Sequence, residues 1–230
     1  MILPMSLSMY QIANLYCRIQ QDHELRREGD MVELIHSQDY DNGRERGQYT
    51  YKVYQSKSHL TGFLKWALPS RQFRLHEKQY NLFPHICSFY EIPELGRGFS
   101  LTIESHHFRY DGTIPNENIF DLSDDELGQR QIIYLDILSD SVGNQSCVPA
   151  WATNLDKEMM ICIKLVKFDF PWKGLQGAVE KYMINTVLRE SVVRTHRQMI
   201  NSADCWSKMA LEEVQLEEKQ VLKNQNWHVP

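Results

Sequence analysis

The sequence of 230 residues lacks any apolar run of the roughly 20 residues that a helix needs to span a bilayer. It also lacks internal repeats, low-complexity tracts and a linker rich in proline or glycine, and no other composition break divides the chain. With 42% apolar residues, the chain can bury a sizeable core. We therefore expect one soluble domain that covers residues 1–230.

An excess of positive charge is missing as well. The 25 basic residues are outnumbered by 30 acidic ones, which gives a net charge of −5. A surface that binds duplex DNA or RNA must neutralise many phosphates, so we expect no nucleic-acid partner. The five cysteines are scattered and form no C-x-x-C pair, which argues against a disulfide framework and a zinc knuckle. Residues 1–10 do not resemble a secretion signal, and a cytoplasmic protein is expected.

Motifs of catalysis are absent too. The chain has no G-x-S-x-G elbow, no phosphate-binding G-x-x-x-x-G-K-S/T loop, no H-E-x-x-H pair and no G-x-G-x-x-G fingerprint. His106 and His107 are neighbours in a strand-like segment, where adjacent side chains point to opposite faces and cannot share one metal ion. We therefore expect neither an enzyme nor a metal site.

The pattern that is present indicates a large antiparallel sheet followed by helices. Residues 47–55 alternate as a strand does, with Tyr49, Tyr51 and Val53 on one face. Further strands are predicted around Phe99–Ile103, Ile133–Ile137 and Met159–Phe170. Helical spacing predicts helices over residues 175–201 and 209–222, and a capping box at Ser123–Glu126 predicts a short helix.

The strand over residues 159–170 carries apolar side chains on both faces. Ile161, Ile163 and Leu165 share one face, whereas Cys162, Val166 and Phe168 share the other. Both faces are therefore covered, by a second sheet, by helices, or by a hollow apolar interior. The sequence leaves these three arrangements open.

Thr50 and Lys52 are the first candidates for binding. Positions i and i+2 of a strand share a face, and a hydroxyl beside an ammonium group suits a phosphate or phosphodiester. The competing interpretation is a polar face exposed to water.

A series of segments, in order along the whole chain, resembles the phosphatidylinositol transfer protein family. They are Ile2-Leu3-Pro4-Met5-Ser6-Leu7, Tyr10-Gln11, Leu15-Tyr16, Gly47-Gln48-Tyr49-Thr50, His76-Glu77-Lys78 with Asn81 and Pro84, Lys164-Leu165-Val166-Lys167-Phe168, Gly174-Leu175-Gln176 with Val179-Glu180, His196-Arg197-Gln198, and Trp206. Met5-Ser6-Leu7 and residues 118–123 are most similar to the retinal degeneration B type of that family.

This resemblance implies an α+β fold of the helix-grip, START-like kind. A curved antiparallel sheet and long helices would enclose one phospholipid, and a C-terminal helix would act as a lid. Exposing the roughly 30 methylenes of two acyl chains at about 0.8 kcal/mol each would cost on the order of 25 kcal/mol, so a carrier must enclose them. The apolar second face of the strand over 159–170 would line that cavity.

The resemblance also implies roles for particular residues. Thr50, Lys52 and Asn81 match the family's inositol-phosphate contacts, Asn14 stands where the family has a glutamine near the headgroup, and Glu218 is the expected carboxylate of the terminal helix. Phe170 and Trp172 correspond to an aromatic pair that inserts into the membrane surface.

Two departures from the family pattern affect its control regions. The basic regulatory loop expected between residues 138 and 159 is short, and its Lys-Thr-Gly-Arg-Gly element is missing. The helix-capping threonine of the lid is replaced by Ala210, a change worth about 1 kcal/mol of helix stability.

These implications lead to three functional hypotheses. The first is a monomeric, non-enzymatic carrier that exchanges phosphatidylinositol for phosphatidic acid or phosphatidylcholine at transiently contacted membranes, with the bound phospholipid as cargo and no cofactor. The second is a sensor of inositol lipids that binds without shuttling. The third is an enzyme on the same fold, with a histidine and a carboxylate inside the cavity.

Overall fold

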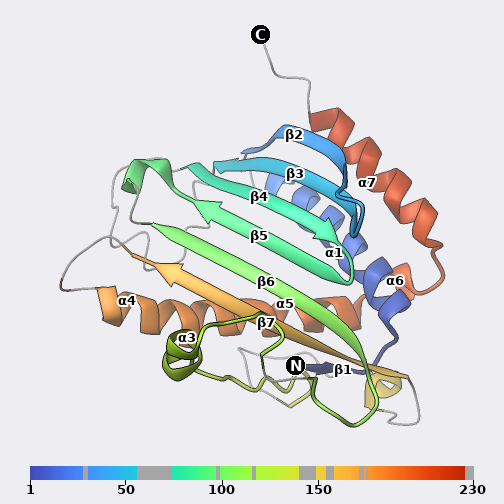
Figure 1. The fold of residues 1–230 in the computed structure, drawn as a ribbon. Helices are drawn as coiled ribbons and strands as arrows, with labels where there is room; N and C mark the ends of the chain where they lie inside the picture. Colours follow the sequence, from blue (N-terminus) through green and yellow to red (C-terminus); the bar gives the residue numbers. More distant parts are fainter. Residues whose placement is uncertain are drawn as a thin grey trace.

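A computed structural model describes residues 1–27, 31–55, 74–96, 99–115, 118–139, 149–153, 158–170, 174 and 176–225. It has the expected α+β architecture, with an antiparallel sheet and helices packed on it (Figure 1). The strands are β1 (Ile2–Leu3), β2 (Met31–Asp41), β3 (Arg46–Gln55), β4 (Arg74–Leu82), β5 (His85–Glu91), β6 (Ser100–Tyr110) and β7 (Met159–Asp169). The helices are α1 (Leu7–Arg27), α3 (Asp124–Gln129), α4 (Gln176–Tyr182), α5 (Arg189–Asn201), α6 (Ala203–Trp206) and α7 (Leu211–Gln225), with a π-helical turn η3 (Met183–Leu188) and short 3-10 turns η1 (Pro93–Leu95) and η2 (Ala150–Thr153).

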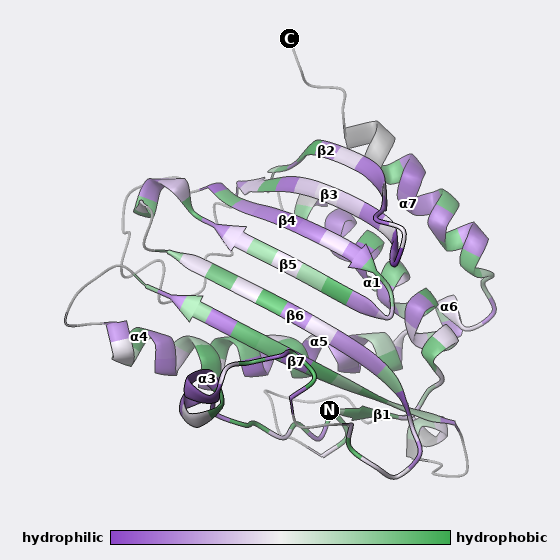
Figure 2. Cartoon of the chain, in the orientation of Figure 1, coloured by the Kyte–Doolittle hydropathy of each residue, from purple (hydrophilic) through white to green (hydrophobic). Residues whose placement is uncertain are grey.

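The sheet has seven strands in the order β1-β7-β6-β5-β4-β3-β2. Strands β2 to β7 follow one another in space as they do in the chain, and the short β1 pairs with β7 at the other edge. Figure 2 shows that β4 is largely hydrophilic whereas β7 is largely hydrophobic. The polar chemistry of the sheet is therefore concentrated toward its β2–β4 side.

The two faces of the sheet have different neighbours. We call the face that contacts α1, α4 and α5 the inner face, because Lys52 on it binds Asp22 of α1 and Phe168 on it packs with Val179 of α4. The opposite, outer face is toward the viewer in Figure 1. Alternation along β3 follows the prediction, since Thr50 and Lys52 are inner and buried, whereas the Tyr49 ring packs against that of Tyr80 on the outer face.

The main core lies between the helices and the β6–β7–β1 side of the sheet. Its fully buried members include residues of β1, α1, β7, α5 and α6, among them Leu3, Met160, Met199, Ile200 and Trp206. The Trp206 indole donates a hydrogen bond of 2.9 Å to the carbonyl of Met199, so its polar edge is satisfied inside the core. This core fixes α5 and α6 against β7.

Most helix predictions are confirmed. The predicted helix over 175–201 forms α4, η3 and α5 in succession, and the predicted helix over 209–222 forms α7. The capping box is present, since the Ser123 hydroxyl accepts from the Glu126 amide and the Glu126 carboxylate accepts from the Ser123 amide. Residue 175 lies outside the described residues.

The predicted strand at Ile133–Ile137 is wrong. This segment is irregular and makes one isolated bridge, between Ile2 and Asp136. Ile137 is fully buried in the main core, while Ile132 and Tyr134 are exposed, so the alternation reflects a covering segment rather than a strand. The long helix α1 was not predicted from the sequence at all.

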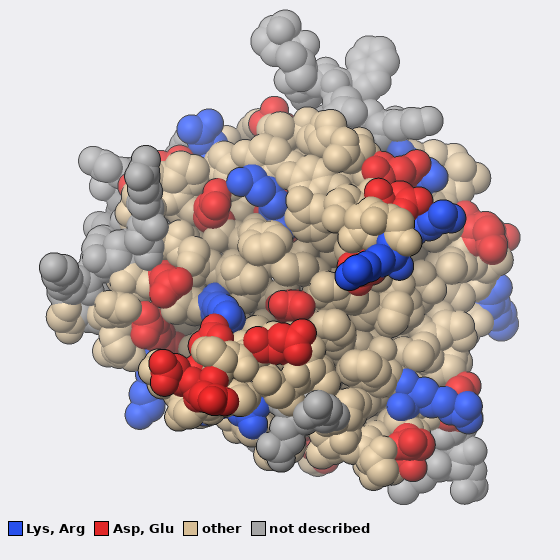
Figure 3. All heavy atoms as spheres, in the orientation of Figure 1, with Lys and Arg blue, Asp and Glu red and all other residues tan. Residues whose placement is uncertain are grey.

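The cover on both faces of β7 is now defined in the described part of the chain. Helices α4 and α5 pack on its inner side, where Phe168 joins a cluster with Val179 and Met183. On the outer side Lys167 donates to Glu126 of α3, and α3 lies just below β7 in the view of Figure 1. Figure 3 shows acidic side chains gathered over α3. Of the three arrangements left open by the sequence, helices therefore account for the inner cover.

Candidate functional site

Polar side chains line the inner face where β3 and β4 pair. The antiparallel register places them directly opposite one another as Gln48–Asn81, Thr50–Gln79 and Lys52–Glu77. Opposite residues on one face of a sheet have Cβ atoms about 4.5–5.5 Å apart. Three successive polar pairs facing the helices are unusual for a core and indicate a site that recognises something polar.

Lys52 is held by an ion pair inside the molecule. Its exposed fraction is 4%, and its Nζ donates to Asp22 Oδ2 of α1 at 2.6 Å. Asp22 is 6% exposed. Each charge stabilises the other, because removal of one partner of a buried ion pair leaves the other charge poorly compensated in a medium of low dielectric constant. This contact also joins α1 to the centre of β3.

Glu77 accepts two phenol hydrogen bonds beside that ion pair. Tyr54 and Tyr90 each donate to its carboxylate at 2.6 Å. Burial raises the pKa of both tyrosines well above 10, and the charge of Glu77 raises it further. Both phenols therefore remain protonated donors at neutral pH and hold the Glu77 carboxylate in place.

A second ion pair connects α1 with the C-terminal helix. Arg18 lies 3.5 Å from Glu218 Oε1 of α7, and the two side chains are 21% and 10% exposed. Burial lowers the pKa of Arg18, but the carboxylates of Glu218, Glu77 and Asp22 outweigh it and leave the pKa raised. Glu218 is therefore an inward-facing residue and does not lie on a solvated face of its helix.

A pocket opens between α1, α7 and the ends of β3 and β4. Its volume is about 210 Å³, and it is lined by Gln11, Leu15, Asp39, Arg46, Gly47, Gln48, Asn81, Phe83, Gln215, Glu218 and Lys219. Gly47 allows the two strands to approach closely, since a Cβ there would lie 2.0 Å from the carbonyl oxygen of Asn81. The pocket brings the predicted residues Asn81 and Glu218 together.

Thr50 and Asn14 lie on surfaces that adjoin this pocket. Thr50 is 3% exposed and stands opposite Gln79, whose Nε2 donates to Ser88 at 2.8 Å while its buried Oε1 has no partner. An unsatisfied buried acceptor is costly, so a ligand hydroxyl is a favourable neighbour here. Asn14 is half-buried and occupies the same stripe of α1 as Arg18 and Asp22, four residues apart in each case.

The predicted headgroup residues are thus arranged along one polar interior rather than in one pocket. Asn81 and Glu218 line the pocket, and Thr50 and Lys52 continue along β3 from the pocket residue Gln48. Lys164 on β7 faces the same interior and donates to Ser105 at 2.9 Å. The arrangement offers cations for a phosphate and neutral groups for hydroxyls.

Sequence reasoning missed Arg18, Asp22 and Glu77. The signal for the first two is the i, i+4 spacing of Tyr10, Asn14, Arg18 and Asp22, which places one polar stripe on a helix. This spacing does not identify a helix by hydrophobic periodicity, because polar residues that face a polar interior do not produce the apolar stripe of an ordinary amphipathic helix.

The expectation of an exposed Phe170 is wrong. Its side chain is 2% exposed and packs with Phe168, Ile92 and Val179, so it is a core residue in this conformation. The alternation of β7 explains this, because Phe168 and the residue two positions later share the inner face. Trp172, the second predicted membrane-inserting residue, lies outside the described residues.

The start of α7 lacks a side-chain cap. Ala210 offers no oxygen to the helix, but its own amide donates to Glu213 Oε2 at 2.9 Å, which is one half of a capping box. Val214, buried fully between Leu15 and Ile19 of α1, anchors the helix instead. Helix α7 is therefore attached mainly through α1, by this apolar cluster and the Arg18–Glu218 pair.

Comparison with known proteins decides the family. The model of the family described as phosphatidylinositol transfer protein matches residues 1–150 and 147–223. The chain belongs to this family.

Relatives match over nearly the whole chain. "Phosphatidylinositol transfer protein 2" of Dictyostelium discoideum is 29% identical over 93% of this chain and 88% of its own length. "Membrane-associated phosphatidylinositol transfer protein 1" of Mus musculus is 29% identical over 96% of this chain, and "Protein retinal degeneration B" of Drosophila melanogaster is 27% identical over 95%. Each of these two is matched over only 20% of its own length. The resemblance to this family, including its retinal degeneration B members, is confirmed.

Among the residues that the structure describes, no helix has the length and apolar character required to traverse a bilayer.

Proposed function

We propose that this protein is a carrier that binds one phosphatidylinositol and exchanges it between membranes against a second phospholipid, phosphatidic acid or phosphatidylcholine. It acts without enzymatic turnover, as a cytoplasmic monomer that contacts membranes transiently. The observation that carries the proposal is the buried Lys52 in a polar row on the inner face of the sheet, in a chain of the phosphatidylinositol transfer protein family. Family membership supports the lipid class.

The charges of the site support recognition of a phosphodiester. Lys52 neutralises the phosphate, and its present partner Asp22 is displaced from the ammonium group when the lipid binds. Asp22 keeps a cationic neighbour, because its charge already contributes to the raised pKa of Arg18. The displacement therefore leaves no isolated buried carboxylate, which makes the exchange energetically accessible.

The neutral groups support selection of inositol. Thr50, Asn81 and Asn14 offer hydroxyl and amide groups, and the Glu218 carboxylate accepts from ring hydroxyls. A headgroup without hydroxyls leaves such buried groups unsatisfied, which disfavours its binding. The pocket of about 210 Å³ suits a headgroup, not two acyl chains.

Apolar side chains further along the inner face support a place for the acyl chains. Ile86, Leu101, Ile103 and Val166 share the inner face by strand register, yet all of them remain partly accessible. Apolar residues that face the helices without being fully buried border unfilled space. The acyl chains of a bound lipid complete this burial.

A sensor that binds without shuttling is the second candidate. It is favoured by the ion pair between Arg18 and Glu218, which ties α7 to α1 and opposes opening. Tight binding with no exchange between vesicles would support this candidate over a carrier.

Mass spectrometry of lipid that copurifies with the chain, combined with transfer between liposomes, tests the proposal. We expect phosphatidylinositol in the purified protein and its movement from labelled donor to unlabelled acceptor vesicles. Purified protein that carries no inositol lipid, and takes up none from vesicles, would contradict both the carrier and the sensor.

Glu218→Gln should release lipid faster. Loss of the carboxylate weakens the tie between α7 and α1, and we expect the dissociation rate of bound phosphatidylinositol to rise roughly tenfold, equivalent to about 1.4 kcal/mol. Dilution of protein loaded with fluorescent lipid into acceptor vesicles measures this rate. Glu212→Gln on the exposed side of the same helix is the matched control and should behave as wild type. An unchanged rate in Glu218→Gln would show that the ion pair does not restrain the lid.

A further inference from the structure

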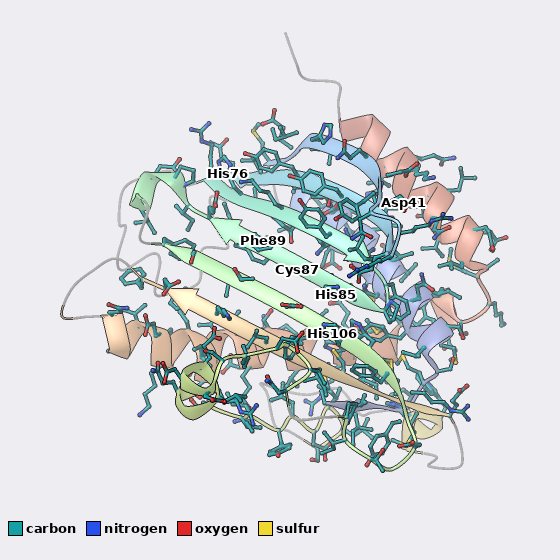
Figure 4. All side chains as sticks on the ribbon, viewed as in Figure 1. Asp41, His76, His85, Cys87, Phe89 and His106 are labelled. Carbon is teal, nitrogen blue, oxygen red and sulfur yellow. The ribbon has the colours of Figure 1, made fainter. Side chains whose placement is uncertain are left out.

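Two histidines and a glutamate meet on the outer face of the sheet, away from the lipid site. His85 of β5 pairs in register with His106 of β6, and Glu104 lies two residues before His106 on the same face. One potential ligand atom from each residue lies within 4.8 Å of the other two. Figure 4 shows His85 and His106 on these neighbouring strands.

Both imidazoles approach the same carboxylate oxygen. His85 Nε2 lies 3.0 Å and His106 Nε2 lies 3.4 Å from Glu104 Oε1. The rings are stacked, with centroids 4.4 Å apart and planes at 17°. Two ring nitrogens and one carboxylate oxygen thus surround one point, and a small tilt of the rings about χ2 directs both lone pairs toward an ion there.

A further carboxylate orients the first histidine. Glu45 Oε1 lies 3.0 Å from His85 Nδ1, so an Nδ1–H that donates to Glu45 makes Nε2, which contacts Glu104 in this structure, the nitrogen that would bind a metal ion. Carboxylate–histidine pairs of this kind fix the tautomer at metal sites and raise the basicity of the ligand. Phe120 packs edge-on against the His106 ring at 5.2 Å and restricts its rotation.

The three ligand side chains are accessible but not fully exposed. His85 is 23%, His106 is 26% and Glu104 is 30% exposed. An ion can therefore enter from solvent, while packing restricts the motion of the ligands. Fully exposed histidine side chains, which rotate freely, would lose more conformational entropy on binding an ion than these partly packed ones.

We propose that His85, Glu104 and His106 form a binding site for a divalent transition-metal ion of the Zn²⁺ class. Imidazole nitrogen and carboxylate oxygen are ligands that Zn²⁺ accepts, and three protein ligands leave at least one position for water. His107, the chain neighbour of His106, lies buried on the inner face as the strand alternation predicts, so it cannot share an ion with His106. The partner comes from the neighbouring strand.

Metal binding at this site crosslinks two strands of the sheet, and through Glu45 it contacts the segment that leads into the pocket. The ligands join β5 to β6, and Glu45 immediately precedes the pocket residues Arg46 and Gly47. An ion that binds only the folded state stabilises it by mass action. We therefore expect Zn²⁺ to raise the melting temperature of the purified chain, and a chelator to reverse the effect.

Titration calorimetry with Zn²⁺ tests the site directly, and Co²⁺ absorption in the visible range reports on its coordination. We expect one ion per chain for wild type. His106→Ala and Glu104→Gln should each lower Zn²⁺ affinity at least about 100-fold, and Glu45→Gln should lower it by roughly 10–100-fold, as loss of an orienting carboxylate does. His36→Ala is the matched control, because His36 is an exposed histidine on strand β2 that hydrogen-bonds Gln38 and packs near Tyr49, outside the proposed metal cluster.

The outcomes separate a built site from surface adsorption. Equal Zn²⁺ affinity in wild type and in His106→Ala would overturn the proposal, as would loss of binding in His36→Ala to the same extent. Circular dichroism of each variant without metal establishes that the fold is retained. Glu45→Gln adds a test that replaces none of the three metal ligands and acts only through the orientation of His85.

Discussion

Lys52→Ala should reduce phosphatidylinositol transfer between liposomes by roughly 100-fold. The ammonium group is the buried cation on β3 in the polar row, and loss of a hydrogen bond to a charged group costs about 1.5–3 kcal/mol, so its upper range corresponds to about 100-fold. Transfer of a fluorescent or radiolabelled lipid measures the effect. Lys78→Ala on the outer face of β4, where Lys78 is exposed beside Glu91, should transfer at the wild-type rate.

Lys52→Ala also lowers the stability of the fold, so its effect on stability has to be separated from its effect on lipid transfer. Removal of Lys52 takes the nearest cation away from the buried Asp22, and because the charge of Asp22 still interacts with Arg18, the cost stays below the roughly 3–5 kcal/mol of a buried pair that is broken outright. The double variant Lys52→Gln with Asp22→Asn removes both charges together and should recover most of that loss. We expect it to fold and still fail to transfer phosphatidylinositol.

Wild-type transfer by the folded double variant would exclude Lys52 as the phosphate-binding group. A double variant that binds phosphatidylinositol tightly, yet exchanges none, would assign the ion pair to lipid release. Both results are read from the same preparation, by mass spectrometry of copurified lipid and by transfer.

Strand prediction from the sequence succeeded where the two faces of a strand differ in residue type and one of them is buried. Thr50 and Lys52 on β3 were placed correctly because the alternation with Tyr49 and Tyr51 is regular and the inner face is buried. The segment Ile133–Ile137 has the same alternation, and Leu135 and Ile137 pack on the core, but its backbone makes only one isolated bridge in the described part of the chain, to Ile2 of β1. Alternation reports which side chains are buried, not whether the backbone pairs.

Helix α1 shows the opposite failure. Its residues Tyr10, Asn14, Arg18 and Asp22 face a polar interior, so burial and hydrophobicity do not coincide along it. The ion pairs that close the site join residues 30 and 200 positions apart in the chain, Asp22 with Lys52 and Arg18 with Glu218. Such pairings depend on tertiary distance, which a single sequence does not contain.

The chain should lose stability when the pH falls from 7.5 to 5, because two histidines are buried in the neutral form. Burial, with a smaller contribution from the charge of Lys164, lowers the pKa of His107 from 6.5 to about 4 and that of His196 to about 3. His196 accepts from the Tyr10 hydroxyl, and His107 lies against the same ring, so they join α5 and β6 to α1.

The direction follows from proton binding. Below pH 6.5 the unfolded chain binds protons at both histidines whereas the folded chain does not, so stability is complete above pH 6.5 and declines as the pH falls toward 4. Each histidine contributes about 2 kcal/mol between pH 7.5 and pH 5, and the pair about 4 kcal/mol. The pKa of the Glu126 carboxyl is lowered to about 2 by its hydrogen bonds with Lys167 and Ser123, so its own contribution is lost only at lower pH.

Urea unfolding at pH 7.5 and pH 5, with a chelator present so that the His85–His106 cluster holds no metal, measures this loss. The double variant His107→Gln with His196→Gln should show a loss about 4 kcal/mol smaller than that of wild type, even though its stability at pH 7.5 is itself lower. His36→Gln, at an exposed position, should retain the full pH dependence of wild type. Because the readout is a difference between two pH values for each protein, general destabilisation by the substitutions does not imitate it. An equal loss of unfolding free energy in wild type and in the double variant would show that protonation of His107 and His196 does not cause the acid destabilisation.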